Sequence, residues 1–314
     1  MKALWLKILC LLILFLQPVA AKEDQRPKPY QSLEWMGPDL TDQWSEQLSI
    51  PDHELSQTVQ AVLAPGFFHE WFEGYMDPVR DWLSSHSIDH STVLSRSHMP
   101  SAVNAEMIAK EISSAQKKVL LIAHSRGGVE VLEALIRFPE LQSKVFGVIF
   151  IQSPFYGTWV ADLFSPASKG VEHIDSWDKF LLHTRLLPAA LKEKLYGVWQ
   201  ATKSLTAERR QEWMRQNESK IRELLDNSPA ITMTSHDPRF FSFRVFEIFR
   251  KLMQIRGIDS DGVVPQRSMQ IPSVGRINLP RSDHAFFVFR NLKNRAQQFK
   301  ICDQALSILS RFKR

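Results

Sequence analysis

Residues Val119–Gly128 read VLLIAHSRGG: five apolar residues run directly into a turn of polar and small ones. An uninterrupted apolar run is typical of a strand that is buried on both faces of a parallel sheet. The residues that follow, Gly128–Phe138, have apolar side chains at helical spacing, namely Val129, Leu132, Leu135 and Ile136. The pattern therefore predicts a buried strand, a sharp turn at Ser125 and a helix.

Ser125 is the candidate nucleophile of this turn. A serine held between a strand and a helix needs small residues two positions before and two after it, because the backbone passes close on both sides. Gly127 meets this requirement, and at Ala123 a methyl group replaces the more common glycine. The positive end of the following helix also stabilises negative charge beside the serine. The alternative is a serine with a purely structural place in the turn.

Strands and helices alternate outward from this turn. The expected strands are Thr58–Leu63, Ser91–Leu94, Lys118–Ala123, Val145–Ile151, Ala230–Thr234 and Arg276–Leu279. The expected helices are Trp71–Ser85, Ala102–Ala115, Gly128–Phe138, Arg244–Met253 and Asn294–Phe312. This alternation predicts an α/β fold with a mostly parallel central sheet and helices on both faces.

Two segments depart from the alternation. Residues 22–57 are polar and contain several prolines, so we expect them to wrap the surface of a domain that spans residues 58–314. Residues from about 160 to 228 are helical in pattern and rich in charge, which predicts an inserted helical cap or a layer of helices over the sheet.

An acidic loop and a histidine follow Ser125 in the order that a triad on such a turn requires. Asp259 and Asp261 precede an apolar turn, and His284 is the one histidine of ten that comes after this loop. His284 can accept the proton of Ser125, while a buried carboxylate holds the imidazole tautomer. Asp261 is preferred over Asp259 because the Gly-Val-Val that follows suits a tight turn. A solvated loop rich in aspartate is the alternative.

A serine nucleophile also needs donors for an oxyanion. The first strand ends in Pro65-Gly66-Phe67, where a glycine lets the backbone N–H of Phe67 turn toward the site. The N–H of Arg126, directly after the nucleophile, is the second candidate donor. An ordinary Pro-Gly turn is the alternative.

Five motifs in this order resemble the α/β-hydrolase superfamily, specifically exported bacterial lipases and esterases of the triacylglycerol lipase type. They are PGF at 65–67, AHSRG at 123–127, QSPFYGT at 152–158, DGVVP at 261–265 and DHA at 283–285. Phe155 stands where those lipases usually have a histidine, and Pro65-Gly66 replaces the more common His-Gly. The resemblance covers about 58–289. It implies a Ser125–Asp261–His284 hydrolase of acyl esters that needs no cofactor.

The resemblance leaves related chemistries open. An acyltransferase or a thioesterase uses the same triad, and a non-catalytic envelope binding protein can have the same fold. Several lipases of this type bind a structural calcium ion near the catalytic histidine, but no acid directly follows His284, so we expect no metal. His86 and His90 lack the glutamate of a zinc-protease motif.

Apolar side chains of the predicted cap are candidates for substrate binding. A helical layer there lies over the carboxyl edge of the sheet, where open α/β folds bind ligands. The residues are Trp159, Phe164, Phe180 and Leu181. They favour an ester with an apolar acyl group, such as a lipid, and a transient contact with a lipid surface. Core packing is the alternative.

The N-terminus predicts export. Residues 1–21 combine Lys2 and Lys7 with an apolar run, Pro18 and small residues, which is the layout of a cleaved secretory signal peptide. We therefore expect a periplasmic or secreted protein, with an uncleaved anchor as the alternative. The net charge of +5 contains no basic block that would indicate a nucleic-acid partner. The 44% hydrophobic composition is globular and excludes disordered, collagen-like and coiled-coil classes, while the oligomeric state stays open.

Overall fold

A single parallel sheet forms the centre of the molecule. The computed structural model describes residues 30, 33–34, 36–43, 52–163, 189–279 and 281–311. Across these residues, six strands lie in the order β2-β1-β3-β4-β5-β6, and all neighbouring strands run parallel. They are β1 (Val59–Ala64), β2 (His90–Thr92), β3 (Lys118–His124), β4 (Val145–Ile151), β5 (Ala230–Ser235) and β6 (Gly275–Leu279).

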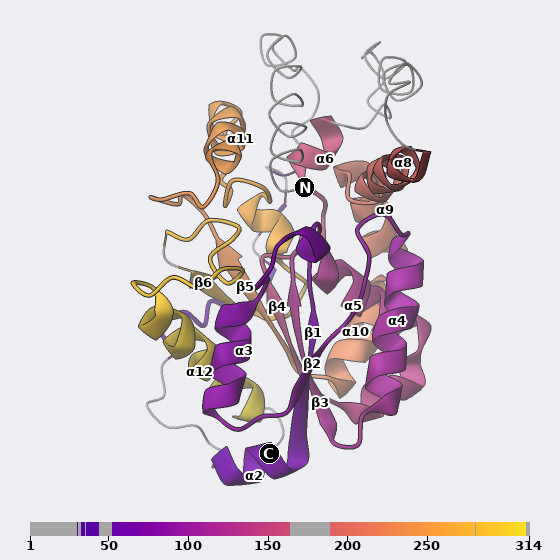
Figure 1. Cartoon of the computed structure of the whole chain (residues 1–314), viewed down its shortest axis with the longest axis vertical. Coiled ribbons are helices and arrows are strands. Elements are labelled where there is room, and N and C mark those ends of the chain that lie inside the picture. Colours follow the sequence, from indigo (N-terminus) through magenta and orange to yellow (C-terminus); the bar gives the residue numbers. More distant parts are fainter. Residues whose placement is uncertain are drawn as a thin grey trace.

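Helices cover both faces of this sheet, as Figure 1 shows. The α-helices are α2 (Asp52–Thr58), α3 (Asp77–Ser85), α4 (Ser101–Ser114), α5 (Arg126–Arg137), α6 (Trp159–Leu163), α8 (Ala189–Lys203), α9 (Ala207–Gln216), α10 (Glu218–Asn227), α11 (Arg244–Ile255) and α12 (Arg295–Arg311). Three 3₁₀ turns, η1 (His69–Trp71), η2 (Pro139–Lys144) and η3 (Gln266–Met269), complete the described elements. The predicted α/β architecture is confirmed.

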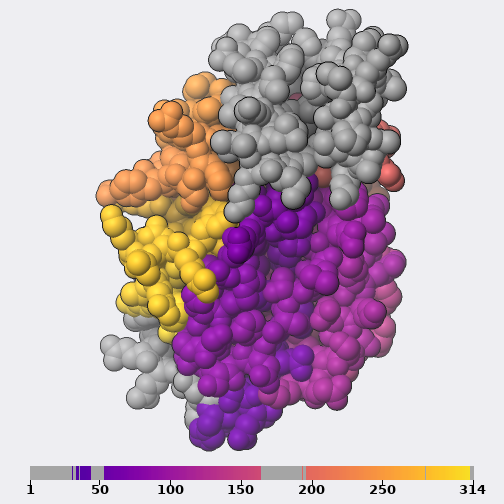
Figure 2. All heavy atoms as spheres, viewed as in Figure 1, coloured from indigo at the N-terminus to yellow at the C-terminus, as the bar shows by residue number. Residues whose placement is uncertain are grey.

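Alternate residues of each strand enter two separate cores, because successive side chains of a strand point to opposite faces. On β1, Ala61 and Leu63 belong to the core that α3 and α12 cover, whereas Val62 and Ala64 belong to the core beneath α4 and α5. The C-terminal segment, yellow in Figure 2, lies against the violet segment that contains α3. Burial on both sides explains why the strands read as continuous apolar runs.

The strand order reverses its direction between β1 and β3. The chain leaves β1 toward β2 on one side and later returns to form β3 on the other side. In open α/β sheets, ligands bind outside the carboxyl ends of the strands at such a switch point. The turns after Ala64 and His124 border this position, and the second of them contains Ser125.

Helices of the segment predicted to be an insertion occupy two places. In Figure 1, α6 and α8 lie above the carboxyl ends of the strands, with α11 on the opposite side of the same end. The helix α10 instead packs beside α5 and η2, where Ile221 and Leu224 enter the core of that face. Helix α10 therefore adds to the helical layer on the α5 side of the sheet, whereas α6 and α8 lie over the carboxyl ends of the strands.

The chain before β3 differs in two details from the prediction. The expected helix Trp71–Ser85 is wrong in its first half, because Gly74 and Met76 have positive φ angles and α3 begins only after them. Within the segment expected to lie on the surface, α2 is helical, and residues 36–43 run beside β6 through the Leu40 N–H, 2.8 Å from the carbonyl oxygen of Arg276.

Residues 1–21, predicted to be a signal peptide, lie outside the described residues. Within the described part of the chain, none of the helices has the length and apolar character to cross a membrane.

Candidate active site

Ser125 lies in a strained turn between β3 and α5. Its φ of 54° and ψ of −128° are rare for a residue with a side chain. A Cβ atom at Gly127 would lie 2.2 Å from the carbonyl oxygen of Ala64, so this position has room only for glycine. The Ser125 N–H donates to the carbonyl of Ile151 at 2.9 Å, which ties the turn to β4.

Three side chains from distant parts of the chain form one hydrogen-bonded row at this turn. His284 Nε2 lies 2.9 Å from Ser125 Oγ, and His284 Nδ1 lies 2.7 Å from Asp261 Oδ2. Because a carboxylate can only accept, Nδ1 carries the ring proton and Nε2 accepts from the serine hydroxyl. The exposed fractions are 8% for Ser125, 7% for His284 and zero for Asp261, so the row is nearly closed to water.

The loop that carries Asp261 fixes the direction of its carboxylate. The backbone N–H groups of Val263 and Val264 donate to Oδ1 at 2.8 and 2.7 Å, which leaves Oδ2 for His284. Asp259, the other candidate, is exposed. The structure thus brings Asp261 to His284 and leaves Asp259 at the surface.

The turn after β1 lies directly beside the serine. A Cβ atom on Gly66 would lie 2.7 Å from Ser125 Cβ, which is too close for any side chain. Glycine thus lets the backbone of this turn lie against the serine. Among the described residues, the N–H of Phe67 donates to no acceptor. As the first residue of α5, Arg126 has no intrahelical acceptor for its own N–H. Both N–H groups predicted to bind an oxyanion therefore belong to turns that flank Ser125.

The side chain of Arg126 is buried away from solvent and holds a neighbouring loop. Its guanidinium pairs with Glu130 at 2.7 Å, donates to the carbonyl of Ser97 at 2.8 Å and lies over the ring of Phe67 at 4.5 Å. Asn104 donates to Glu130 at 2.8 Å. Burial nevertheless raises the pKa of Glu130 to about 7, against the opposing effects of Arg126 and Asn104.

Side chains that the sequence reasoning missed surround His284. His124 Nε2 lies 2.9 Å from the carbonyl oxygen of His284, and its Nδ1 lies 2.7 Å from the hydroxyl oxygen of Tyr75. Gln152 Nε2 donates to the carbonyl of Asp283 at 2.9 Å. A signal for two of them was present, since His124 and Gln152 are the polar residues that end or directly follow the apolar strands β3 and β4.

Aromatic rings gather beside His284 as well. The ring of Phe246 lies edge-on to the imidazole with centroids 6.2 Å apart, and Phe243 lies 5.2 Å from Phe246. Phe72 and Phe289 each lie within 5.8 Å of Phe243. These four rings come from three separate segments, so no local pattern in the sequence indicates the cluster.

Of the residues predicted to bind substrate, Trp159 is described and the others are not. Trp159 is 8% exposed and packs in a core cluster with Tyr30, Val245 and Phe249. The structure thus places it among core residues and outside the hydrogen-bonded row. Phe164, Phe180 and Leu181 lie outside the described residues.

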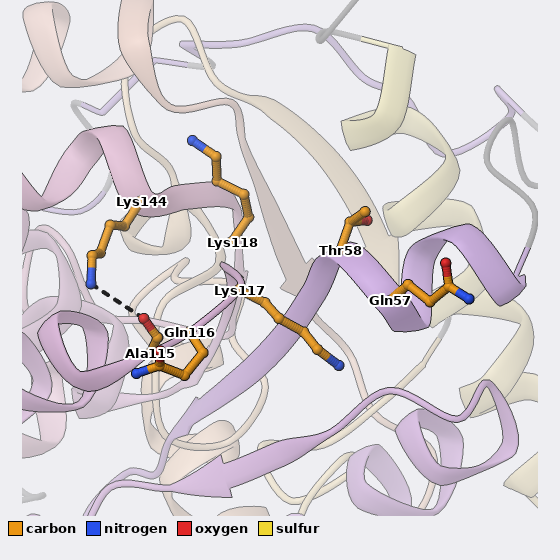
Figure 3. Close-up of a pocket in the computed structure, with 7 residues that line it drawn as sticks. All are labelled: Gln57, Thr58, Ala115, Gln116, Lys117, Lys118 and Lys144. Carbon is orange, nitrogen blue, oxygen red and sulfur yellow. Dashed lines mark hydrogen bonds between the residues drawn. The ribbon is translucent and has the colours of Figure 1, made fainter.

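A pocket of about 400 Å³ lies at the other end of the sheet. Figure 3 shows its lining residues: Gln57, Thr58, Ala115, Gln116, Lys117, Lys118 and Lys144. Its lysines already donate to backbone carbonyls, for example Lys144 to Ala115 at 3.2 Å and Lys117 to Ser56 at 2.7 Å. Because β1 and β3 begin here and Ser125 follows the end of β3, this pocket is remote from the site.

No cluster of metal-ligating side chains occurs within the described ranges. The two histidines considered as metal ligands have other partners: His86 Nε2 lies 3.0 Å from Asp303, and His90 Nδ1 lies 3.1 Å from the carbonyl oxygen of Ile88.

Comparison with solved structures agrees with this architecture. The metagenomic carboxyl esterase MGS0156 is similar over 92% of this chain and 82% of its own, with a TM-score of 0.63 and 17% identity. The chain has the α/β-hydrolase fold. The mature Bacillus licheniformis lipase BlEst2 shares this α/β-hydrolase fold over 76% of the chain and 89% of its own, with a TM-score of 0.54 and 18% identity.

A third similar solved structure is phospholipase PlaB from Legionella pneumophila. It has a TM-score of 0.52 and 12% identity over 81% of this chain and 60% of its own. No protein-family model matches the sequence, and no curated protein matches it significantly.

Proposed function

We propose that this protein is a serine hydrolase that cleaves carboxylic esters by two-step acyl transfer. The observation that carries the proposal is the row from Ser125 Oγ through His284 to Asp261, with distances of 2.9 and 2.7 Å. The strained turn at Ser125 supports it, because strain of this kind concentrates at functional sites.

The first step acylates the serine. His284 Nε2 takes the proton of Ser125 Oγ as the oxygen attacks the ester carbonyl, and Asp261 stabilises the imidazolium. The N–H groups of Phe67 and Arg126 bind the oxyanion. Nε2 then returns its proton to the leaving alkoxide, and the alcohol departs as the acyl-enzyme forms.

The second step releases the acid. His284 Nε2 takes a proton from water, whose oxygen attacks the acyl carbonyl of the ester formed with Ser125. Collapse of the second tetrahedral intermediate breaks the Oγ–acyl bond, and the proton on Nε2 returns to the serine. No step requires a cofactor or a metal ion.

The substrate class is an ester with an apolar acyl group, such as a lipid. Support comes from the aromatic rings of Phe246, Phe243, Phe72 and Phe289 near His284. The solved structures of similar fold are a carboxyl esterase, a lipase and a phospholipase, which agrees with this choice. We further propose that residues 1–21 direct export and that the mature enzyme acts in the periplasm or outside the cell, with transient contact to a lipid surface.

The test is hydrolysis of p-nitrophenyl esters from short to long acyl chains by the chain without residues 1–21. Ser125→Ala is the matched variant, because it removes one oxygen atom and keeps the turn. We expect turnover by the wild type, a loss of at least about 1000-fold in Ser125→Ala, and a chain-length optimum that distinguishes esterase from lipase. Equal activity of the two proteins would contradict the assignment of the nucleophile.

A serine-directed phosphonate separates the remaining alternatives. A folded wild type that reacts with the phosphonate but hydrolyses no ester would indicate an acyltransferase or thioesterase with the same triad. Alcohol acylation in the presence of a competing lipid alcohol identifies the transferase. A folded protein that neither reacts with phosphonate nor turns over esters would indicate a binding protein of this fold.

A further inference from the structure

Two hydrogen bonds and one close backbone contact join the turn after β1 to the loop that carries His284. They pass through Tyr75 and His124, which have no role in the proton transfers proposed above. The Tyr75 oxygen lies against the backbone of Gly66 and 2.7 Å from His124 Nδ1. His124 Nε2 in turn lies 2.9 Å from the carbonyl oxygen of His284.

The partners of His124 determine its tautomer. A backbone carbonyl only accepts, so Nε2 carries a proton and donates to His284. The ring is buried, and burial followed by the nearby His284 lowers the pKa of His124 well below its ordinary value. The ring is therefore neutral, Nδ1 is an acceptor, and the Tyr75 hydroxyl donates to it.

Tyr75 completes the path to the other side of the site. A Cβ atom on Gly66 would lie 2.8 Å from the Tyr75 oxygen, which shows how closely the hydroxyl approaches that backbone. The Tyr75 hydroxyl, whose proton is directed to His124, thus joins that ring to the backbone of Gly66. Gly66 directly precedes Phe67, whose N–H is a proposed oxyanion donor.

Other contacts also support the backbone around His284. Gln152 donates to the carbonyl of Asp283 at 2.9 Å, and the N–H of His284 donates to the carbonyl of Asp261 at 3.1 Å. Neither of them extends to the turn after β1. The Met76 N–H also donates to the carbonyl of Val288 at 2.9 Å, four residues beyond His284. The contact to His284 itself runs through His124 and Tyr75 to the backbone of Gly66.

We propose that Tyr75 and His124 are positioning residues. They hold His284 and the turn after β1 at a fixed distance from each other on the two sides of Ser125. The inference rests on the proposed function. The bridge formed by Tyr75 and His124 ends at Gly66, one residue before Phe67, and at His284. A change in its length therefore moves the His284 base relative to the Phe67 N–H that is proposed to bind the oxyanion. A misplacement of about 1 Å in such a site can lower the rate by roughly 100-fold.

Two substitutions of His124 separate the two halves of the bridge. In His124→Gln, the amide nitrogen can take the place of Nε2 and still donate to His284. In His124→Asn, the amide oxygen can take the place of Nδ1 and accept from Tyr75, but the donor to His284 is lost. We expect kcat to fall about 10- to 100-fold in His124→Asn, with KM changed less than about threefold.

The conservative variant and the tyrosine variant complete the set. His124→Gln keeps the donor to His284 but has no atom at the place of Nδ1 to accept from Tyr75, so kcat should fall about tenfold with KM little changed. Tyr75→Phe, which removes only the hydroxyl, should lower kcat about tenfold with the same small effect on KM. The control is His86→Asn, which removes a half-buried histidine contact to Asp303 and should leave kcat unchanged.

The kinetic outcomes distinguish this inference from the proposed function. A wild type without ester hydrolysis contradicts the proposed function. Hydrolysis that His124→Asn and Tyr75→Phe leave unchanged contradicts the positioning role alone, as does a wild-type kcat in His124→Gln. Circular dichroism of each variant separates loss of kcat from loss of folding.

A spectroscopic measurement tests the bridge without activity. In the ¹⁵N-histidine NMR spectrum of the wild type, the His124 signals are assigned by their absence from His124→Gln. We expect a neutral ring with its proton on Nε2 at about pH 7, and a shift of the Nδ1 signal in Tyr75→Phe. A ring protonated on Nδ1, or on both nitrogens, would overturn the proposal without any measurement of activity.

Discussion

Glu130 is a carboxylate buried at the centre of a polar network one helical turn beyond Arg126. It pairs with the Arg126 guanidinium at 2.7 Å and accepts from Asn104 at 2.8 Å, yet its exposed fraction is only 1%. Desolvation of the ionised form exceeds these favourable contacts, so the pKa of Glu130 is raised to about 7. Because the pKa of this acid is higher in the folded protein than its ordinary value, its contribution to the free energy of unfolding falls as the pH rises.

Glu130→Gln should remove part of the pH dependence of folding. Between its ordinary pKa of 4.5 and about 7, folded wild type binds a proton that the unfolded chain has released. The free energy of unfolding of the wild type therefore falls relative to the variant as the pH rises through this window. Urea unfolding of both proteins at several pH values measures the difference. The exposed Glu106→Gln is the control, and parallel pH curves for wild type and Glu130→Gln would contradict the prediction.

At the scale of elements, the loop between β2 and α4 supports the turn after β1. Ser97 Oγ accepts from the Phe68 N–H at 2.6 Å and donates to Glu70 at 2.7 Å, while the Ser97 N–H donates to the same carboxylate at 2.9 Å. Arg126 holds this loop by its bond to the Ser97 carbonyl. Helix α5, the loop and the turn after β1 are thus joined through one serine.

Ser97→Ala should lower kcat about tenfold and change KM less than about twofold. Loss of an oxyanion donor itself lowers kcat by roughly 100- to 1000-fold, and loosening the turn that carries Phe67 should have a smaller effect. Steady-state kinetics with the ester that the wild type hydrolyses best provide the measurement. Ser95→Ala, a buried serine of the same loop, is the control. Wild-type kinetics in Ser97→Ala would show that the loop does not support the site.

At the scale of the whole molecule, the reactivity of the Cys302 thiol measures whether the hydrophobic core is closed or open. Cys302 is 3% exposed, lies on α12 in the core that also contains α3 and β1, and burial raises the pKa of its thiol well above the ordinary value. Cys10 is the one other cysteine of the sequence, so a chain without residues 1–21 has a single thiol.

Labelling of this thiol should follow global unfolding. A core residue becomes accessible only when the domain opens, so a disulfide reagent should react at least about 1000-fold more slowly in native buffer than in urea. The rate as a function of urea concentration should parallel the unfolding curve. Ser113→Cys, which places a thiol at an exposed position, is the control and should label at once. Fast labelling of Cys302 in native buffer would show that α12 opens separately.

Several features could be predicted from the sequence because they depend on local chemistry. Apolar runs such as Val145–Ile151 define strands, since residues buried on both faces have no polar alternation. The strand-turn-helix at Ser125 follows from the small residues around it. The interrupted helix near Gly74 was missed, because the positive φ of Met76 is imposed by packing; its N–H donates to the carbonyl of Val288, far along the chain.

The sequence alone determined the order of elements, the parallel sheet buried on both faces, and the candidates Ser125 and His284 with an acid from the loop that holds Asp259 and Asp261. These features could be predicted because strand burial and turn chemistry depend on neighbouring residues. Only the tertiary structure decided that Asp261, and not Asp259, meets His284, and that His124, Tyr75 and Gln152 hold the surrounding backbone. These contacts join residues that are up to 160 positions apart. Their distances depend on strand order and close packing, which no local pattern encodes.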